Sequence, residues 1–171
     1  MAHADTDPTN PPPLRSGCLG LIVNDDAEIL VVRPTYNNPE GYYQLPGGAA
    51  GEGEKPWAAV AREVREETGL HLTPLRLLVL DWIEAKPDGR AAGQNLVFWC
   101  GRIPGGTPIT LPEPAPGEEQ PELDDYRWVR ATDLDGVCAP FQARRIRAAL
   151  QARIHGTVAE LIRGHDAYAQ L

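Results

Sequence analysis

Apolar runs separated by short polar segments predict a series of β-strands along the chain. The runs CLGLIV (18–23) and EILVV (28–32) flank the turn sequence NDDA, so they predict two strands joined by a tight turn. Three later runs also have the composition of strands, namely LRLLVLDWIEA (75–85), QNLVFWCGRI (94–103) and DDYRWVRA (124–131). The pattern therefore predicts that a β-sheet forms the centre of the protein.

Between the second and third of these runs, the apolar positions change to a helical spacing. Pro56 suits the first position of a helix, and Gly69 suits the left-handed position that ends one. We therefore expect a helix from about Pro56 to Thr68, with its three glutamates largely off the core-facing stripe. The residues of that stripe are Trp57, Val60, Ala61, Val64 and Thr68.

A second amphipathic segment near the C-terminus predicts another helix. It begins near Pro140, ends near Gly156, and has Ile146, Leu150 and Ile154 as its apolar stripe. The basic cluster ARRIR (143–147) within it is typical of a solvated helix face. The pattern does not decide the structure of residues 157–171.

Strands on both sides of one helix, with a second helix at the end, predict an α/β protein in which helices cover a mixed sheet. Residues 1–15 are polar and rich in proline, which predicts a disordered arm. Residues 16–165 then form one domain, and 166–171 a C-terminal tail. The Pro/Gly/Glu-rich loop 104–121 is long enough to suggest a functional flap.

Composition limits the partners of the protein. The 171 residues carry a formal net charge of −8, which gives no electrostatic reason to bind nucleic acid or an anionic membrane non-specifically. We therefore expect no stable nucleic-acid partner and no membrane association. A phosphorylated small molecule stays a candidate ligand if a cation bridges the two negative partners.

Targeting signals and cysteine spacing predict a cytoplasmic protein. The N-terminal sequence lacks the basic and apolar regions of a signal peptide, and no apolar run approaches the length of a membrane span. Cys18, Cys100 and Cys138 form neither a metal-binding pair nor a disulfide framework. We interpret them as apolar filler in a reducing cytoplasm.

Three glutamates crowd the end of the first predicted helix, where carboxylates are unfavourable because a helix C-terminus carries partial negative charge. Glu63, Glu66 and Glu67 have the spacing i, i+3 and i+4, so their side chains converge near the helix surface. Convergent carboxylates suit Mg²⁺ or Mn²⁺, hard cations that take oxygen ligands and commonly share substrate phosphates. The alternative is a solvated acidic face, the usual meaning of a charge run.

The sequence around these glutamates resembles the box of the Nudix hydrolases. That box reads G, five residues, E, seven residues and then R-E-U-x-E-E-x-G-U, where U is aliphatic. Here Gly48 is followed by AAGEG, Glu54, KPWAAVA and REVREETGL, which ends at Leu70, so every position matches without a gap. The lead-in LPGG (45–48), the flanking strand order and the later YRWV strand are also similar to the family.

This resemblance implies an α/β/α sandwich that hydrolyses a pyrophosphate bond in a nucleoside diphosphate linked to another moiety, with water attacking phosphorus. Mg²⁺ is then the expected cofactor, with Mn²⁺ as an alternative, and a small-molecule nucleotide is the expected substrate. The implied metal ligands are Glu66 and Glu67, with Glu63 as a third ligand and candidate base, and the carbonyl of Gly47 as a further ligand.

The resemblance also assigns supporting roles. Arg62 would orient the glutamates and Glu54 would brace the loop, with Gly48 and Gly69 as structural support. An acid downstream of the box often completes the site in this family. Glu122, six residues before Trp128, fits that place best, and Glu118 and Glu119 are alternatives.

Contacts to the rest of the substrate are less sharply indicated. Arg33 ends a predicted strand and is a candidate for a phosphate contact, whereas an ordinary surface arginine is the commoner case. Tyr36 and Gln44, in the tyrosine-rich loop that follows, are further candidates for substrate binding. Trp82 and Trp99 are candidates for stacking on a base or for packing in the core.

Two other functions use a related fold. A prenyl-diphosphate isomerase needs its own acid–base pair, usually including a cysteine, and a ligand-binding regulator often has a broken box. The intact box disfavours both. The substrate stays open among nucleoside triphosphates, ADP-ribose, nucleotide sugars, dinucleoside polyphosphates and RNA 5′ ends, as does the formation of a homodimer.

Overall fold

The structure is a computed structural model that describes residues 13–87 and 89–169. The arm expected over residues 1–15 falls outside the described part except for its last three residues, of which Arg15 already belongs to the first strand. The described strands are β1 (Arg15–Val23), β2 (Ile29–Pro34), β3 (Gly47–Ala49), β4 (Arg76–Ile83), β5 (Gly93–Arg102), β6 (Leu123–Val129), β7 (Ala159–Ile162) and β8 (His165–Asp166). The helices are α1 (Pro56–Thr68) and α2 (Pro140–His155), with a short 3₁₀ turn at Leu134–Gly136.

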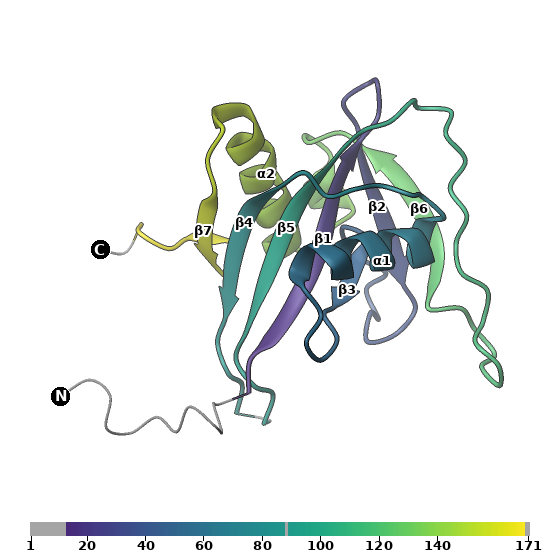
Figure 1. The fold of residues 1–171 in the computed structure, drawn as a ribbon, viewed down its shortest axis with the longest axis horizontal. Coiled ribbons are helices and arrows are strands. Elements are labelled where there is room, and N and C mark those ends of the chain that lie inside the picture. Colours follow the sequence, from purple (N-terminus) through teal and green to yellow (C-terminus); the bar gives the residue numbers. More distant parts are fainter. Residues whose placement is uncertain (1–12, 88, 170–171) are drawn as a thin grey trace.

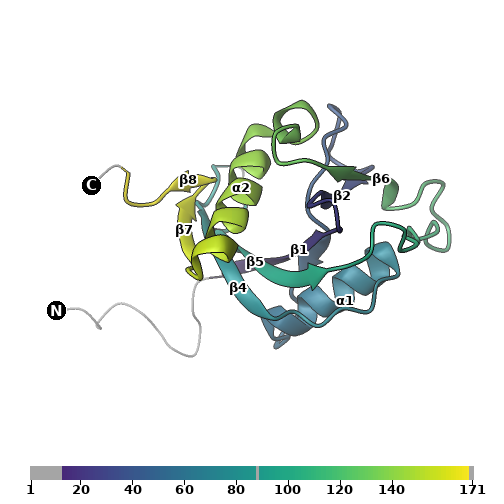
Figure 2. The same cartoon turned by 90° about the horizontal axis from the view of Figure 1, so that it is seen from above.

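These strands form one mixed sheet in the order β6-β2-β1-β5-β4-β7-β8, with β3 paired to β1 outside this path. The pairs β1–β5 and β4–β7 are parallel, and the others are antiparallel. Helices α1 and α2 lie on opposite faces of the sheet, as Figures 1 and 2 show. The predicted α/β sandwich is therefore confirmed.

Each face of the sheet has its own apolar core. On the α1 face, Val60 and Val64 pack against Ile22 and Leu30 of the sheet. On the α2 face, Ile146 packs against a larger cluster that includes Leu21. Since side chains alternate along a strand, the near-continuous apolar run of β1 supplies both cores.

Local signals placed α1 correctly. Pro56 begins the helix, and Gly69 ends it with φ +71° and an N–H that donates to the carbonyl of Arg65 at 2.9 Å. The predicted stripe is wrong at two positions, because Trp57 is 53% exposed and Glu67 is buried. Glu67 lies seven residues after Val60 and therefore shares its face of the helix.

The predicted stripe of α2 is also partly wrong. Ile146 is fully buried, but Ile154 near the end of the helix is 66% exposed. The basic cluster 143–147 is not a uniformly solvated face, because Arg145 is only 2% exposed. This arginine faces the sheet and forms an ion pair with Asp81 of β4.

The segment that the sequence left undecided, 157–171, adds the strands β7 and β8 to the sheet within its described part. None of the helices formed by the described residues is long and apolar enough to cross a membrane.

The unequal burial of two isoleucines in α2 makes a direct test of this packing. Ile146→Ala should lower the free energy of unfolding by about 2–5 kcal/mol, because it leaves a cavity on the α2 face. Ile154→Ala should change it by no more than about 0.5 kcal/mol, because the side chain is largely in water. Urea denaturation of both variants measures the difference, and equal losses would mean that the helix is packed through another face.

Candidate active site

The site is built where β3 approaches the end of α1. Gly47 begins β3 with φ +137°, and a Cβ there would lie 2.1 Å from the carbonyl oxygen of Cys18 in β1. Glycine is therefore required for the close pairing of these strands. This pairing brings the N–H of Gly47 within 2.6 Å of Oε2 of Glu67, to which it donates a hydrogen bond.

Glu67 is a buried carboxylate among other carboxylates. Its side chain lies on the core side of α1, and the residue is only 5% exposed. Burial raises the pKa of Glu67 to about 8, and the nearby charges of Glu63, Glu122 and Glu66 act in the same direction, against the hydrogen bond from Gly47. Ionised Glu67 therefore costs the folded protein free energy through desolvation and through repulsion by the other carboxylates. These effects are stronger than that of the helix dipole alone.

Arg62 is the cation that the chain itself supplies to this cluster. It donates through Nη1 to Glu63 at 2.7 Å and to Glu66 at 3.1 Å, and through Nη2 to Glu54 at 2.9 Å. Glu54 also accepts the N–H of Gly51 at 2.8 Å, so it links the box loop to Arg62. The hydrogen bonds from Arg62, together with the N–H of Gly51, lower the pKa of Glu54 to about 2.

Gly48 leaves room for Glu63, because a Cβ at Gly48 would lie 2.6 Å from the Glu63 carboxyl carbon. Burial raises the pKa of Glu63, while the hydrogen bond and charge of Arg62 lower it. A carboxylate with a raised pKa is a stronger base than an ordinary one, which suits the base role implied for Glu63.

The structure brings Glu122 to the same cluster. Its backbone carbonyl accepts the N–H of Thr35 at 3.0 Å, which holds it beside the start of the 35–43 loop. The charge of Glu122 raises the pKa values of both Glu63 and Glu67, and Tyr36 hydrogen-bonds to its side chain.

The donor set suits a hard divalent cation. All four side chains are carboxylates, and the buried one has a pKa raised by the others, so a cation would relieve the repulsion. Within residues 13–87 and 89–169, no group of three acidic, histidine or cysteine side chains already encloses a cation position. Glu63 and Glu66 are instead paired with Arg62, so binding a cation would require them to turn from it.

The structure has two neighbouring cavities that share part of their lining, and Gly47 and Gly48 line one of them. The first, of about 630 Å³, is here called the box cleft; it lies against Gly47 and Gly48 on one side and Arg145 on the other. The second, of about 410 Å³, is called the aromatic pocket and is lined by Tyr42 and Tyr43 among others. The residues common to both cavities are Tyr36, Gln44, Phe141 and Gln142.

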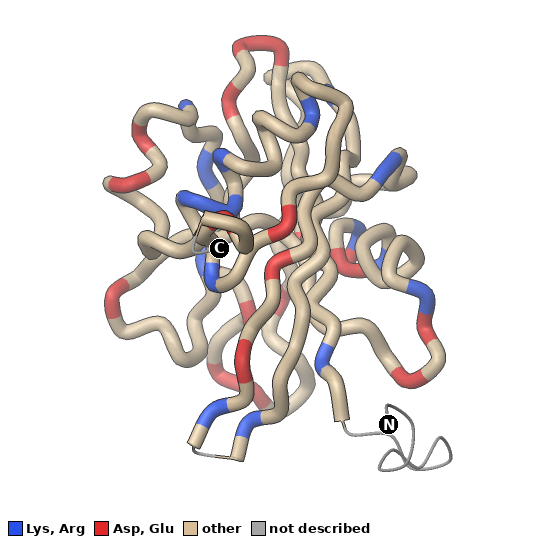
Figure 3. The backbone as a smooth tube through the Cα atoms, turned by 90° about the vertical axis from the view of Figure 1, so that its left-hand side faces the viewer, with Lys and Arg blue, Asp and Glu red and all other residues tan. Residues whose placement is uncertain are grey.

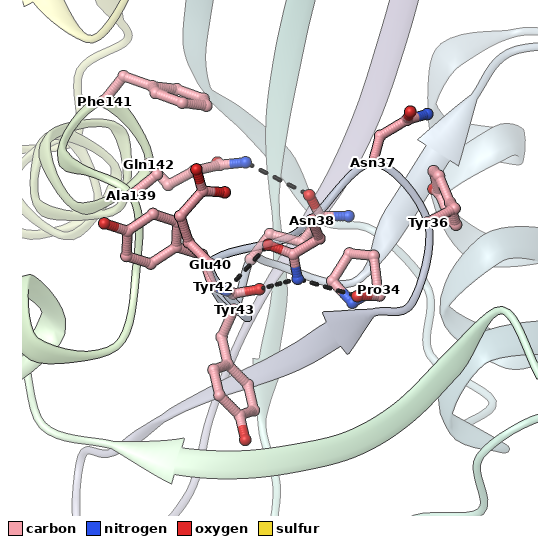
Figure 4. A pocket seen from close by; sticks show the side chains of 11 residues that line it. Pro34, Tyr36, Asn37, Asn38, Glu40, Tyr42, Tyr43, Ala139, Phe141 and Gln142 are labelled. Carbon is pink, nitrogen blue, oxygen red and sulfur yellow. Dashed lines mark hydrogen bonds between the residues drawn. The ribbon is translucent and has the colours of Figure 1, made fainter.

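The 35–43 loop forms one side of the aromatic pocket and the start of α2 forms the other (Figure 4). Asn38 ties the loop together, because its Nδ2 donates to the carbonyls of Pro34 and Tyr42 at 2.9 Å each, and its Oδ1 accepts the N–H of Tyr42 at 2.9 Å. In Figure 4, Tyr36 and Phe141 lie at opposite sides of the view. The hydrogen bonds of Asn38 hold the loop that carries Tyr36 in one conformation.

The predicted substrate contacts divide into two groups. Tyr36 and Gln44 do line the cavities beside the box. Arg33 instead donates to Asp124 at 2.7 Å and is not among the residues that line either cavity. Trp82 and Trp99 do not line them either, and Arg153 covers the Trp99 ring at 4.3 Å.

Sequence reasoning missed two residues of the site, Asp81 and Arg145. Asp81 is fully buried in β4 and pairs with Arg145 at 2.7 Å. A lone acid inside the apolar run LRLLVLDWI was the available signal, because a buried carboxylate needs a partner. The sequence does not say which of the four arginines of α2 is that partner.

Comparisons with known proteins show which proteins the chain is similar to. The NUDIX domain model matches residues 13–151. An RNA pyrophosphohydrolase of Rhizobium meliloti is 30% identical over 129 residues, which cover 70% of this chain and 77% of the relative. The structure of a MutT Nudix hydrolase from Burkholderia pseudomallei is 26% identical with a TM-score of 0.62, over 82% of this chain and 98% of that one. A MutT protein from Methanosarcina mazei shares the fold, with a TM-score of 0.64 at 23% identity over 85% and 96% of the two chains.

Burial of Glu67 predicts how the stability of the metal-free protein varies with pH. Its pKa is about 8 in the folded state and near the ordinary 4.5 in the unfolded chain, so the folded state binds more protons between these values. Stability should therefore fall as pH rises from about 4.5 to 8, by on the order of a few kcal/mol. In Glu67→Gln the amide oxygen can still accept the Gly47 N–H, so this fall should be much smaller.

Urea denaturation at several pH values in EDTA measures the effect, with the exposed Glu52→Gln as the matched control. At pH 8 the Glu67→Gln protein should be at least as stable as the parent. A clear loss of stability in Glu67→Gln at that pH would show that the carboxylate stabilises the fold.

Proposed function

The chain belongs to the Nudix family and is a pyrophosphate-bond hydrolase of nucleotide derivatives, and we propose that it works with a divalent cation held by the box carboxylates. The observation that supports this proposal is the burial of Glu67 within reach of the charges of Glu63, Glu122 and Glu66, next to Gly47, which lines a cleft of about 630 Å³. Mg²⁺ is the proposed ion, and Mn²⁺ would bind the same oxygen ligands.

Each box residue has a role in this proposal. Glu66, Glu67 and the Gly47 carbonyl hold the cation, with Glu63 and Glu122 completing the site. When bound, the cation neutralises phosphate charge and lowers the pKa of water. Glu63 accepts a proton from the water that attacks phosphorus, because its own pKa is raised by burial.

Arg62 stabilises the ionised glutamates until substrate and cation arrive. Its pairing with Glu54 ties it to the box loop, so it can stay in place when Glu63 and Glu66 turn toward the cation. Tyr36 holds Glu122 through the hydrogen bond between their side chains. Together these contacts position the glutamates, and the charges of Arg62 and Glu54 do not line the box cleft.

The substrate proposed first is a small nucleotide derivative. The net charge of −8 opposes non-specific binding of long RNA, and basic and acidic positions are interspersed along the chain in Figure 3. A 5′-triphosphorylated RNA end is the rival substrate, because the Rhizobium relative is named an RNA pyrophosphohydrolase and Arg15 and Lys86 line the box cleft.

The isomerase alternative lacks a suitable cysteine. Burial raises the pKa of Cys18 to about 11, of Cys100 to about 12 and of Cys138 to about 11, and none of the three lines the box cleft. Thiols that stay protonated are poor acid–base partners at neutral pH. Three buried free thiols also fit a reducing compartment, and we propose a cytoplasmic location on that ground.

A panel of nucleotide derivatives, incubated with Mg²⁺ or Mn²⁺, tests the reaction. We expect hydrolysis that EDTA abolishes, and in ¹⁸O-labelled water we expect the label in a phosphate product because water attacks phosphorus. The panel should include a 5′-triphosphorylated oligonucleotide beside ADP-ribose, nucleotide sugars and nucleoside triphosphates. Full turnover in EDTA after metal-free purification, or label on the sugar or alcohol product alone, would overturn the proposal.

The downstream acid has its own test. Glu122→Gln should lower kcat by at least about tenfold at limiting Mg²⁺, because it removes charge from the metal cluster. Glu113→Gln, the same change at an exposed position of the 104–121 loop, should leave kcat unaltered. If the two variants behave alike, another residue completes the site.

A further inference from the structure

Arg145 is one member of a buried ion pair that the proposed reaction does not use. It reaches from α2 to the sheet, where Nε donates to Oδ2 of Asp81 at 2.7 Å. The other oxygen of Asp81 accepts the N–H of Gly164 at 3.0 Å. The guanidinium is therefore held in one orientation between the helix and the sheet.

A chain of side-chain amides continues from this pair toward the box. Nη1 of Arg145 donates to Oε1 of Gln142 at 2.8 Å, and Nε2 of Gln142 donates to Oε1 of Gln44 at 3.4 Å. Gln44 pairs with Val32 of β2 through the backbone. The network therefore spans the cleft wall from β4 to the loop that carries Tyr36.

One nitrogen of the Arg145 guanidinium takes no part in these hydrogen bonds. Nη2 is buried and has no hydrogen-bond partner among the described residues. An unpaired buried donor is costly, so such a group normally meets an acceptor. Arg145 lines the box cleft, and an acceptor that enters this cleft is the available partner.

The chemistry of that acceptor follows from Asp81. Because Asp81 already balances the charge of Arg145, the free Nη2 group offers two N–H donors without a net positive charge. Such a group suits a neutral oxygen or nitrogen acceptor better than a phosphate, whose recognition favours uncompensated charge. The proposed cation site at the box is better suited to the phosphates.

Two aromatic side chains and a glycine line the same cleft as Arg145. The Phe141 ring lies 5.5 Å from Cζ of Arg145 and is 41% exposed, and Tyr36 is exposed at the junction of the two cavities. On the floor, a Cβ at Gly17 would lie 2.3 Å from Oδ1 of Asn95, so glycine leaves space for that carboxamide. Amides and aromatic faces together are the usual surroundings of a nucleobase.

We propose that the box cleft binds the base of the nucleotide and that Arg145 is a specificity-determining residue that donates to a 6-oxopurine. O6 of such a base is an acceptor that an N–H group of Nη2 can meet, whereas adenine presents a donor at position 6. This inference rests on the proposed function for its place in the reaction, but base binding itself is measurable without turnover.

Equilibrium binding of uncharged nucleosides to the metal-free parent tests the proposal without any variant. Guanosine and inosine, which share O6, should bind with similar affinity, and adenosine should bind about tenfold or more weakly. Equal affinity for guanosine and adenosine would overturn the proposal.

Arg145→Lys then assigns the preference to this side chain, because lysine keeps a positive charge for Asp81 but lacks the Nη2 group. It should remove the preference for guanosine while leaving the affinity for adenosine unchanged. Arg144→Lys is the matched control, since Arg144 is on the same helix and lines a different cavity. Phe141→Leu should weaken guanosine and adenosine alike, because a ring face does not distinguish them.

Two results would contradict the role of Arg145. One is an equal loss of guanosine and adenosine affinity in a folded Arg145→Lys protein, which would make the residue structural. The other is a loss of inorganic pyrophosphate binding in the presence of Mg²⁺ in Arg145→Lys, which would make it a phosphate ligand. A guanosine preference that persists while no nucleotide is hydrolysed would leave base recognition standing and would overturn only the proposed function. Melting temperatures of each variant establish that it is folded.

Discussion

The buried carboxylate of Glu67 is the constraint on which the rest of the site depends. The N–H of Gly47 is the hydrogen-bond partner that the structure gives it, and three other glutamates act on its pKa. A carboxylate in this position opposes folding whenever it is ionised and uncompensated. A divalent cation would remove that cost and would at the same time bring the charge that a pyrophosphate needs for attack by water. The same arrangement therefore weakens the metal-free protein and prepares the reaction.

Elements on opposite faces of one sheet supply the two halves of the proposed site, the box carboxylates and Arg145. β1 pairs with β3, which fixes Gly47, while the Val60 and Val64 side of α1 packs on the sheet and carries Glu67 inward. On the other face, Asp81 orients Arg145 beside the same cleft. The proposed sites of phosphate chemistry and of base recognition thus belong to different elements, so under this proposal changes in α2 could alter substrate preference without disturbing the box.

The sequence predicted those features that depend on local signals. Pro56 and Gly69 marked the bounds of α1. The i, i+3, i+4 spacing predicted that Glu63, Glu66 and Glu67 converge, and the family resemblance pointed to Glu122; as ligands these residues stay a prediction. The sequence-based predictions were wrong where tertiary contacts decide whether a side chain is buried. Glu67 was predicted to lie largely off the core-facing stripe, although it lies seven residues after Val60 and shares its face of the helix. Arg145 was grouped with solvated arginines because its partner, Asp81, lies 64 residues earlier in the chain. The strands β7 and β8 have only four and two residues, and their pairing partners rather than their composition make them strands.

Binding of Mn²⁺ to the metal-free protein tests the central claim, that the carboxylates are arranged for a cation, most directly. Electron paramagnetic resonance reports the free ion, so a titration yields the affinity without substrate or turnover. The account predicts saturable binding by the parent, affinity at least about tenfold weaker in Glu67→Gln because a carboxylate ligand is lost, and unchanged affinity in Glu52→Gln. If Glu67→Gln binds Mn²⁺ as tightly as the parent does, Glu67 is not a ligand and the account of the site is wrong.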